Sequence, residues 1–218
     1  MRTTVEQLNI IICGVGGQGV VLMSELLGHA AVLGKLSIRG SEVLGMAQRG
    51  GSVVSNIRIG SEFHAPLVPE GRCDIMVALE PSEALRNVKY LSESSLVILN
   101  TRKIIPFTVF IDKSTYPELE IVIKKLNEVA DSVIAIDASQ IAEETGSLLS
   151  TNVVMLGALF GIGRIPVDVE TMKAVIRKSL PARTIVANTK AFDIGYATVN
   201  SLLESQTGYL VSRQGIEP

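Results

Sequence analysis

The stretch that decides the fold runs from Leu8 to Lys35 and reads LNIIIC-GVGGQG-VVLMSELLGHAAVLGK. Its first part, Leu8–Cys13, is a mainly apolar run rich in β-branched side chains, which is typical of a strand buried on both faces of a parallel sheet. A glycine-rich turn follows at Gly14–Gly19. From Val20 to Lys35 apolar residues recur at helical spacing, and Gly34 is the expected stop. The stretch therefore predicts a strand, a tight turn and a helix.

Strand and helix patterns alternate along most of the remaining chain. Further strands are expected at residues 36–39, 52–59, 73–79, 95–99, 108–111 and 132–136. Helices are expected to begin near Pro81 and to cover 117–130, 150–163, 168–180 and 184–203, with Asp168 as an N-cap. The partly alternating pattern of 52–59 favours a half-exposed strand that is open to antiparallel pairing. Together these patterns predict an α/β fold with a helical C-terminal section.

Nothing in the sequence divides the chain into separate units. It contains no internal repeat and no low-complexity linker, and 218 residues are enough to bury a sizeable core. We therefore expect one domain over residues 1–218, with its core at about 8–203 and a loose polar tail at 204–218.

The composition argues against several classes of protein. Hydrophobic residues make up 47% of the chain and charged residues 19%, which is too apolar for a disordered chain. Lys and Arg number 20 against 22 Asp and Glu, so no net positive field exists to hold nucleic acid. The apolar run Val153–Ile162 is only about half of the roughly 20 residues that a bilayer span needs. We therefore expect neither nucleic acid nor a membrane as a partner.

The cysteines and histidines limit the metal chemistry that the chain can hold. The chain has two cysteines, Cys13 and Cys73, and two histidines, His29 and His64. These are too few for a four-thiolate iron–sulfur cluster or for an ordinary zinc site without other ligands, so a redox metal is expected on a partner. Both cysteines lie in apolar runs and Met1–Glu6 shows no signal-peptide pattern, which predicts the reducing cytoplasm.

The glycine-rich turn is the first candidate site. It fits G-x-G-x-x-G between a strand and a helix, where bare backbone N–H groups can approach a phosphate-type anion. The alternative is that its glycines only let the strand pack against its helix. NAD is disfavoured because position 39, where the dinucleotide fingerprint wants an acid, is an arginine, which we interpret as a surface cation rather than a contact for the extra phosphate of NADP. The candidate residues are Gly14, Gly16, Gly17, Gln18 and Gly19.

The second candidate is the glycine-containing segment Ser41–Ser52, SEVLGMAQRGGS, interpreted as a long loop over residues 40–51. Its arginine offers a planar fork of donors, and the two glycines after it allow unusual backbone angles. Such a loop can grip a carboxylate, a phosphate or a partner's backbone, or it can simply be a turn that feeds the next strand. If 36–39 pairs with the first strand, both loops leave the same carboxyl edge of the sheet, where ligands of open α/β sheets bind. The candidate residues are Gln48, Arg49, Gly50, Gly51 and Ser52.

A complete catalytic constellation is missing from the sequence. There is no P-loop, no nucleophile elbow, no metal-binding helix and no Gly-Asp-Gly segment of the kind that binds thiamine diphosphate through magnesium. Glu80, Glu83 and Arg86 are interpreted as helix-end and i,i+3 charge pairs. We therefore expect no catalytic residue and no metal site in this chain. A stand-alone NAD(P)-binding oxidoreductase and a purely structural interaction module remain as alternatives.

Four segments in order carry a family resemblance: GVGGQGV at 14–20, SEVLGMAQRGGSV at 41–53, HAPLVPEGRCDIMVALEPSEALR at 64–86 and VILNT at 97–101. Together they resemble the gamma-type subunit of the 2-oxoacid:ferredoxin oxidoreductases, over about residues 8–203. Within that family the sequence is most similar to subunits that serve indolepyruvate. The pairing of GVGGQG with QRGG is far more specific than either motif alone.

The resemblance implies a Rossmann-like, mostly parallel sheet flanked by helices. It also implies a larger partner subunit that carries thiamine diphosphate, magnesium and iron–sulfur clusters. The complex is expected to decarboxylate an arylpyruvate oxidatively with coenzyme A, giving an aryl-acetyl-CoA and reduced ferredoxin, whereas related subunits serve pyruvate or other 2-oxoacids. The chain alone is expected to bind none of these cofactors and to be inactive. Both candidate loops match the family's loops, and their expected role is to shape the cleft or admit coenzyme A.

Overall fold

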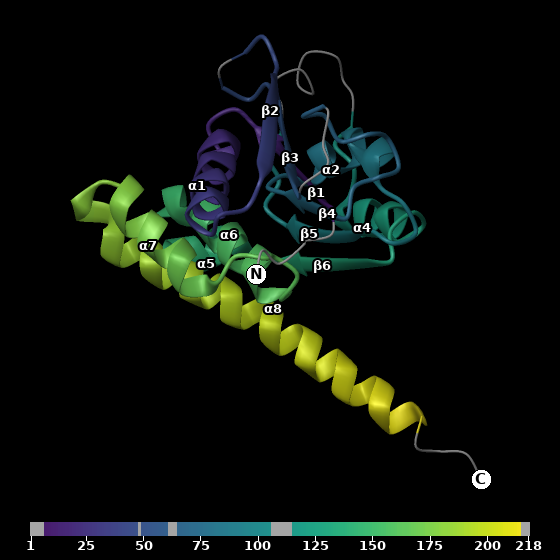
Figure 1. The fold of residues 1–218 in the computed structure, drawn as a ribbon. Coiled ribbons are helices and arrows are strands. Elements are labelled where there is room, and N and C mark those ends of the chain that lie inside the picture. Colours follow the sequence, from purple (N-terminus) through teal and green to yellow (C-terminus); the bar gives the residue numbers. More distant parts are fainter. Residues whose placement is uncertain (1–6, 48, 61–64, 106–114, 215–218) are drawn as a thin grey trace.

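In the computed structural model, which describes residues 7–47, 49–60, 65–105 and 115–214, with side chains described as far as residue 205, the chain is built on a six-stranded sheet (Figure 1). The strand order is β2-β3-β1-β4-β5-β6. The strands are β1 (Leu8–Val15), β2 (Ile38–Leu44), β3 (Ser52–Ile59), β4 (Ile75–Ala78), β5 (Leu96–Asn100) and β6 (Ser132–Ile136). β1, β4, β5 and β6 are parallel, whereas β3 is antiparallel to both of its neighbours.

Helices cover both faces of this sheet. They are α1 (Val20–Leu33), α2 (Pro81–Arg86), α4 (Leu119–Asn127), α5 (Ala138–Glu144), α6 (Thr151–Gly161), α7 (Val169–Ser179) and α8 (Ile185–Gln214), with short 3-10 turns at Val88–Tyr90, Leu148–Ser150 and Ala182–Thr184. α1 and α5 to α8 pack on one face around the larger buried cluster, and α2 and α4 pack on the other around the smaller one (Figure 1). The predicted α/β class, mostly parallel sheet and helical C-terminal section are confirmed.

Several local predictions are also confirmed. The strand, turn and helix of residues 8–35 form β1, the glycine turn and α1, and Gly34 closes α1 with its N–H donating to the Ala30 carbonyl. Asp168 is the N-cap of α7, because its Oδ1 accepts from the Thr171 N–H at 2.9 Å. The apolar run around 153–162 forms α6, which is almost wholly buried. Among the helices that the structure describes, none combines the length and the apolar character that a bilayer crossing requires.

The strand pairing on the β2 and β3 side of the sheet differs from the prediction. The short strand expected at 36–39 is β2, which extends to Leu44 and pairs with β3 rather than with β1, so the expected loop at 40–51 begins only after Leu44. β3 is antiparallel, as its pattern allowed, but it is buried rather than half-exposed. It lies between two strands, and the side chain of Asn56 within it accepts from the Val68 N–H at 3.1 Å. The segment around Val68 therefore covers a polar side chain that the alternating pattern predicted to be exposed to solvent.

Two further differences concern helices. The tail expected to be loose from residue 204 continues as α8 to Gln214. Its Glu, Gln and Arg residues are polar, but they favour a helix, as does leucine. Helix α5 was not predicted, although Asp137 before it caps the helix by accepting from the Gln140 N–H at 2.8 Å. The expected strand at 108–111 lies outside the described residues.

α6 and α8 cross with their backbones in close contact. A Cβ at Gly157 would lie 2.1 Å from the Phe192 carbonyl oxygen, and a Cβ at Gly195 would lie 2.1 Å from the Val154 carbonyl oxygen. Real Cβ atoms do not approach backbone atoms this closely, so glycine is required on both helices. The rings of Phe160 and Phe192 pack edge to face beside this crossing, with centroids 5.6 Å apart.

Both cysteines are expected to be inert in the folded protein. Burial raises the pKa of the Cys73 thiol to about 12, and burial raises the pKa of the Cys13 thiol well above its usual value. Only the thiolate is nucleophilic, and both groups stay protonated at pH 8. We expect Ellman's reagent to label neither thiol at pH 8 in the native protein and both after unfolding in guanidinium. Rapid labelling of either thiol without denaturant would contradict this assignment.

Candidate functional site

The two candidate loops meet at the carboxyl edge of the sheet. The Gly16 N–H donates to the Gly51 carbonyl oxygen at 2.7 Å, and the Gly50 N–H donates to the Gly16 carbonyl oxygen at 3.1 Å. We call residues 14–19 the glycine loop and the described residues 45–47 and 49–51 the hairpin loop. The predicted placement of both loops at the same edge is confirmed, but the predicted pairing of 36–39 with the first strand is wrong. The hairpin loop reaches this edge because β3 runs antiparallel to β1, which pairs Val15 with Ser52.

The side chain of Gln18 folds back into the glycine loop. Its Oε1 accepts from the Val15 N–H at 2.8 Å, and its Nε2 donates to the Leu79 carbonyl oxygen at 2.9 Å. A Cβ at Gly14 would lie 2.7 Å from that Oε1, so Gly14 makes room for the glutamine. Gln18 therefore joins the ends of β1 and β4, and part of the glycine pattern serves this internal packing.

Other glycines of the loops are required by backbone conformation. Gly17 has φ 100° and Gly50 has φ 74°, and no described atom lies within 4 Å of a Cβ built at either. Gly19 has φ 78°, and a Cβ there would lie 2.4 Å from Nδ2 of Asn152 at the start of α6. Left-handed backbone of this kind favours glycine. The open space beside Gly17 and Gly50 leaves the main chain accessible where the loops meet.

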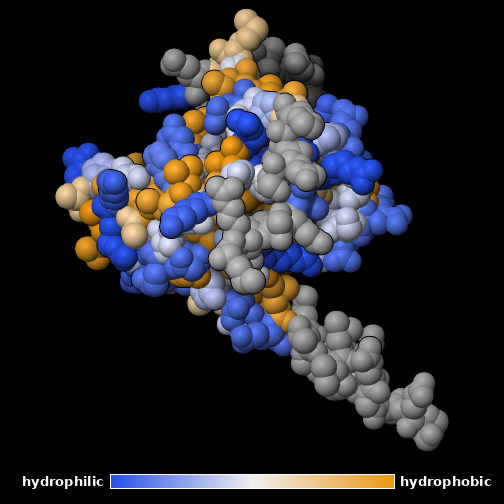
Figure 2. Space-filling model, in the orientation of Figure 1, coloured by the Kyte–Doolittle hydropathy of each residue, from blue (hydrophilic) through white to orange (hydrophobic). Residues whose placement is uncertain are grey.

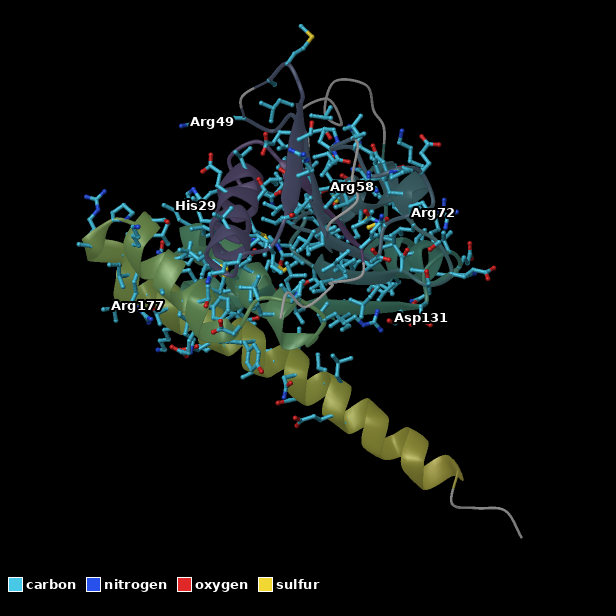
Figure 3. The ribbon with its side chains drawn as sticks, viewed as in Figure 1. His29, Arg49, Arg58, Arg72, Asp131 and Arg177 are labelled. Carbon is cyan, nitrogen blue, oxygen red and sulfur yellow. The ribbon has the colours of Figure 1, made fainter. Side chains whose placement is uncertain are left out.

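Arg49 lies at the outer side of the hairpin loop. Its side chain is exposed and extends away from the sheet (Figure 3). Val43 and Leu44, which lead into the loop, are 53% and 63% exposed, and Met46 is fully exposed. Figure 2 shows apolar surface at this tip of the molecule. The hairpin therefore presents a cation beside an apolar tip. Gln48 lies outside the described residues.

Two buried glutamates lie under the loops, and this arrangement was missed in the sequence. Glu83 is 2% exposed, and its Oε2 accepts from the Ser52 Oγ at 2.5 Å. Burial raises the pKa of Glu83, while the Ser52 hydrogen bond and the Arg86 charge act in the opposite direction. The predicted helix-end and i,i+3 pairs are confirmed, since Glu80 caps α2 and Arg86 Nε lies 3.5 Å from Glu83 Oε1. No pattern in the sequence indicated the contact with Ser52, which lies 31 residues away.

Glu80 connects this network to the chain after β5. It is fully buried and accepts from the Ser82 Oγ at 2.6 Å, from the Ile104 N–H at 3.2 Å and from the Tyr116 hydroxyl. Burial raises the pKa of Tyr116, and the hydrogen bond to Glu80 acts in the same direction. The carboxyl edge at β4 is therefore a connected set of hydrogen bonds whose acceptors are two carboxylates.

The remaining candidates lie apart from this edge. A hollow of about 800 Å³ lies at the opposite edge of the sheet, at Asn9 and Asp74, with Arg58 and Arg72 in its wall (Figure 3). Arg58 there donates through Nε to the Asn9 Oδ1 at 2.9 Å. His29 is exposed on α1, and His64 is not among the described residues. Within the described ranges no group of three or more His, Cys, Asp or Glu side chains comes together to hold a metal ion.

The carboxyl edge thus offers groups suited to recognition. Arg49 supplies an exposed cation, the glycines supply accessible main chain, and the glutamates are engaged in internal hydrogen bonds. Such a surface can bind and orient an anionic group or a partner's backbone.

Comparisons with known proteins agree over most of the chain. The model of the family described as pyruvate ferredoxin/flavodoxin oxidoreductase matches residues 9–198. The chain is 47% identical over 190 residues to the indolepyruvate oxidoreductase subunit IorB of Archaeoglobus fulgidus, covering 87% of this chain and 94% of that protein. It is 41% identical over 200 residues to the protein of the same name from Pyrococcus horikoshii, covering 91% and 98%. The solved structure of pyruvate oxidoreductase subunit PORC from Thermotoga maritima matches with a TM-score of 0.67 at 26% identity, covering 88% of this chain and 96% of that one.

Proposed function

Because the chain belongs to the pyruvate ferredoxin/flavodoxin oxidoreductase family, we propose that it supports the coenzyme A-dependent oxidation of an arylpyruvate such as indolepyruvate. It is the small subunit of a 2-oxoacid:ferredoxin oxidoreductase of the indolepyruvate type. The observation that carries the proposal is the 47% identity to an indolepyruvate oxidoreductase subunit across 94% of that protein. In the reaction, the 2-oxoacid loses CO₂, its acyl group passes to the coenzyme A thiol with release of a proton, and ferredoxin takes the electron pair.

The cofactors of this reaction are assigned to a larger subunit. Thiamine diphosphate with magnesium would act there as the electron sink for decarboxylation, and iron–sulfur clusters would carry the electrons. Two cysteines cannot ligate a four-thiolate cluster, and both are buried in the core. The residues of this chain therefore do not fit such a cluster, and the chain is proposed to work only within a hetero-oligomer.

The two loops are proposed to complete the active-site cleft. The glycine loop would supply main chain through Gly14, Gly16, Gly17, Gln18 and Gly19, and the second segment would act through Gln48, Arg49, Gly50, Gly51 and Ser52. Arg49 would hold an anionic group of coenzyme A, whose phosphates suit its planar fork. The hydrogen bonds between the loops and the exposed, outward guanidinium support this role. The apolar tip at Met46 supports contact of this edge with the larger subunit.

We also propose the domain organisation of the chain and its cellular location. Residues 1–218 are treated as one gamma-type domain, supported by a single sheet on which both helical layers pack. A cytoplasmic location is supported by the two unpaired cysteines, Cys13 and Cys73.

Reconstitution tests the proposed function. Co-expressed with its thiamine-dependent companion, the chain is expected to copurify with it and to support viologen reduction that requires coenzyme A. Indolepyruvate and phenylpyruvate should be the fastest of a panel that includes pyruvate and 2-oxoglutarate. Pyruvate is the second candidate substrate, because a solved relative is a pyruvate oxidoreductase subunit.

Two controls accompany the reconstitution. The companion without this chain should be impaired, and the chain without the companion should be inactive. Oxidation of a 2-oxoacid by the isolated chain, or failure of the two proteins to associate, would overturn the proposal.

A further inference from the structure

Glu83 reaches Ser52, at the base of the hairpin loop, from the other side of the sheet. It lies on α2, which packs on the face opposite to α1, and it is 2% exposed. Both of its oxygens are engaged: Oε2 accepts from the Ser52 Oγ at 2.5 Å, and Oε1 lies 3.5 Å from Arg86 Nε. A buried carboxylate that holds a hydroxyl at this distance fixes that hydroxyl strongly.

Glu83 is itself held in place by its neighbours. Its N–H donates to Oε2 of the fully buried Glu80 at 3.0 Å. Its carbonyl oxygen accepts from the Asn87 Nδ2 at 2.9 Å. The carboxylate therefore extends from a fixed backbone, and Ser52 is the group positioned by it.

Ser52 in turn fixes the residues that carry Arg49. Its carbonyl oxygen accepts from the Gly45 N–H at 2.8 Å, which closes the hairpin loop at its base. Inside the loop, a Cβ at Gly51 would lie 2.4 Å from the Ala47 carbonyl oxygen, so the backbones of these two residues approach closely. Arg49 is three residues before Ser52 within this closed loop.

We propose that Glu83 is a positioning residue that sets the place of Arg49 through Ser52. The inference rests on the proposed function for its catalytic consequence, because Arg49 is there assigned to coenzyme A. It concerns a residue that touches neither substrate nor cofactor. The restraint of the hairpin loop by Glu83 can be tested without measuring the reaction.

The test compares Ser52→Ala and Glu83→Gln with the wild-type complex. Removing the donor of the charge-assisted hydrogen bond (Ser52→Ala) or the charge of its acceptor (Glu83→Gln) is expected to raise the KM for coenzyme A roughly tenfold, with kcat at saturating coenzyme A nearly unchanged. The double variant should be no worse than the more affected single variant, because Ser52→Ala removes the donor of this one hydrogen bond and Glu83→Gln removes the charge of its acceptor. Trypsin should cleave the full-length chain after Arg49 roughly tenfold faster in each variant, as read by mass spectrometry.

Ser95→Ala is the matched control. Ser95 is also a buried hydroxyl with a 2.5 Å hydrogen bond, to the Cys73 carbonyl oxygen, but it lies at the opposite edge of the sheet. It should lose stability without a change in KM or in cleavage after Arg49. The proposal is overturned if Ser52→Ala and Glu83→Gln change KM and cleavage no more than Ser95→Ala does. If the complex has no activity, the proposed function fails, and the cleavage rates still decide whether Glu83 restrains the loop.

Discussion

Gly157→Ala is expected to lower the free energy of unfolding by about 3 kcal/mol, which corresponds to a melting temperature roughly 10 °C lower. The added methyl group would lie 2.1 Å from the Phe192 carbonyl oxygen, and that atom belongs to the backbone of α8. The helices must therefore separate, which loosens the packing of Phe160 against Phe192. Thermal and urea unfolding followed by circular dichroism measure the effect.

Gly28→Ala is the matched control for this substitution. Gly28 lies within α1, and no described atom lies within 4 Å of its Cβ position. Alanine there should raise stability by about 0.5–1 kcal/mol, because it favours the helix without a clash. If Gly157→Ala were as stable as the wild type, the close crossing of α6 and α8 would be wrong.

Arg49→Ala is expected to raise the KM of the complex for coenzyme A by about 10- to 100-fold, the effect of losing a charge-assisted contact of roughly 1.5–3 kcal/mol. The side chain is exposed, so the fold should be unaffected. Assembly is expected to persist, because the loop's backbone contacts remain. Steady-state viologen reduction over a range of coenzyme A concentrations measures the effect, and gel filtration checks assembly.

Arg39→Ala provides the comparison for charge alone. Arg39 is also exposed, but it pairs in register with Arg58 at the far edge of the sheet. Its loss should leave the kinetics unchanged. An Arg49→Ala complex that assembles and keeps a wild-type KM would remove the anion-binding role from the hairpin loop.

Local patterns in the sequence predicted the centre of the fold well. The apolar run at 8–13, the glycine turn and the periodic helix after it gave β1 and α1 almost residue for residue. The order of the strands was harder, because pairing between β2 and β3 depends on a hairpin whose glycines carry no register information. The polar residues of β3 also led to the wrong prediction that the strand is half-exposed. Asn56 is instead buried, and its side chain accepts from the Val68 N–H.

The candidate site was also predictable in part from local sequence motifs. The motifs placed both loops at one edge, and the structure brings them into hydrogen-bond contact. Side-chain contacts across the fold could not be predicted. The hydrogen bond of Gln18 to the Leu79 carbonyl oxygen is one example, and that of Ser52 to Glu83 is another. Each joins residues that only the tertiary structure brings together. The pairing of Glu83 with Arg86 was predictable from their i,i+3 spacing, whereas the burial of Glu83 was not.

The course of α8 has a practical consequence. This helix leaves the body at the end away from the hairpin loop and continues to Gln214 (Figure 1). An affinity tag or a surface tether attached beyond it would start far from the carboxyl edge of the sheet. Immobilising the chain there therefore keeps that edge open to incoming proteins, which suits biosensor measurements of assembly.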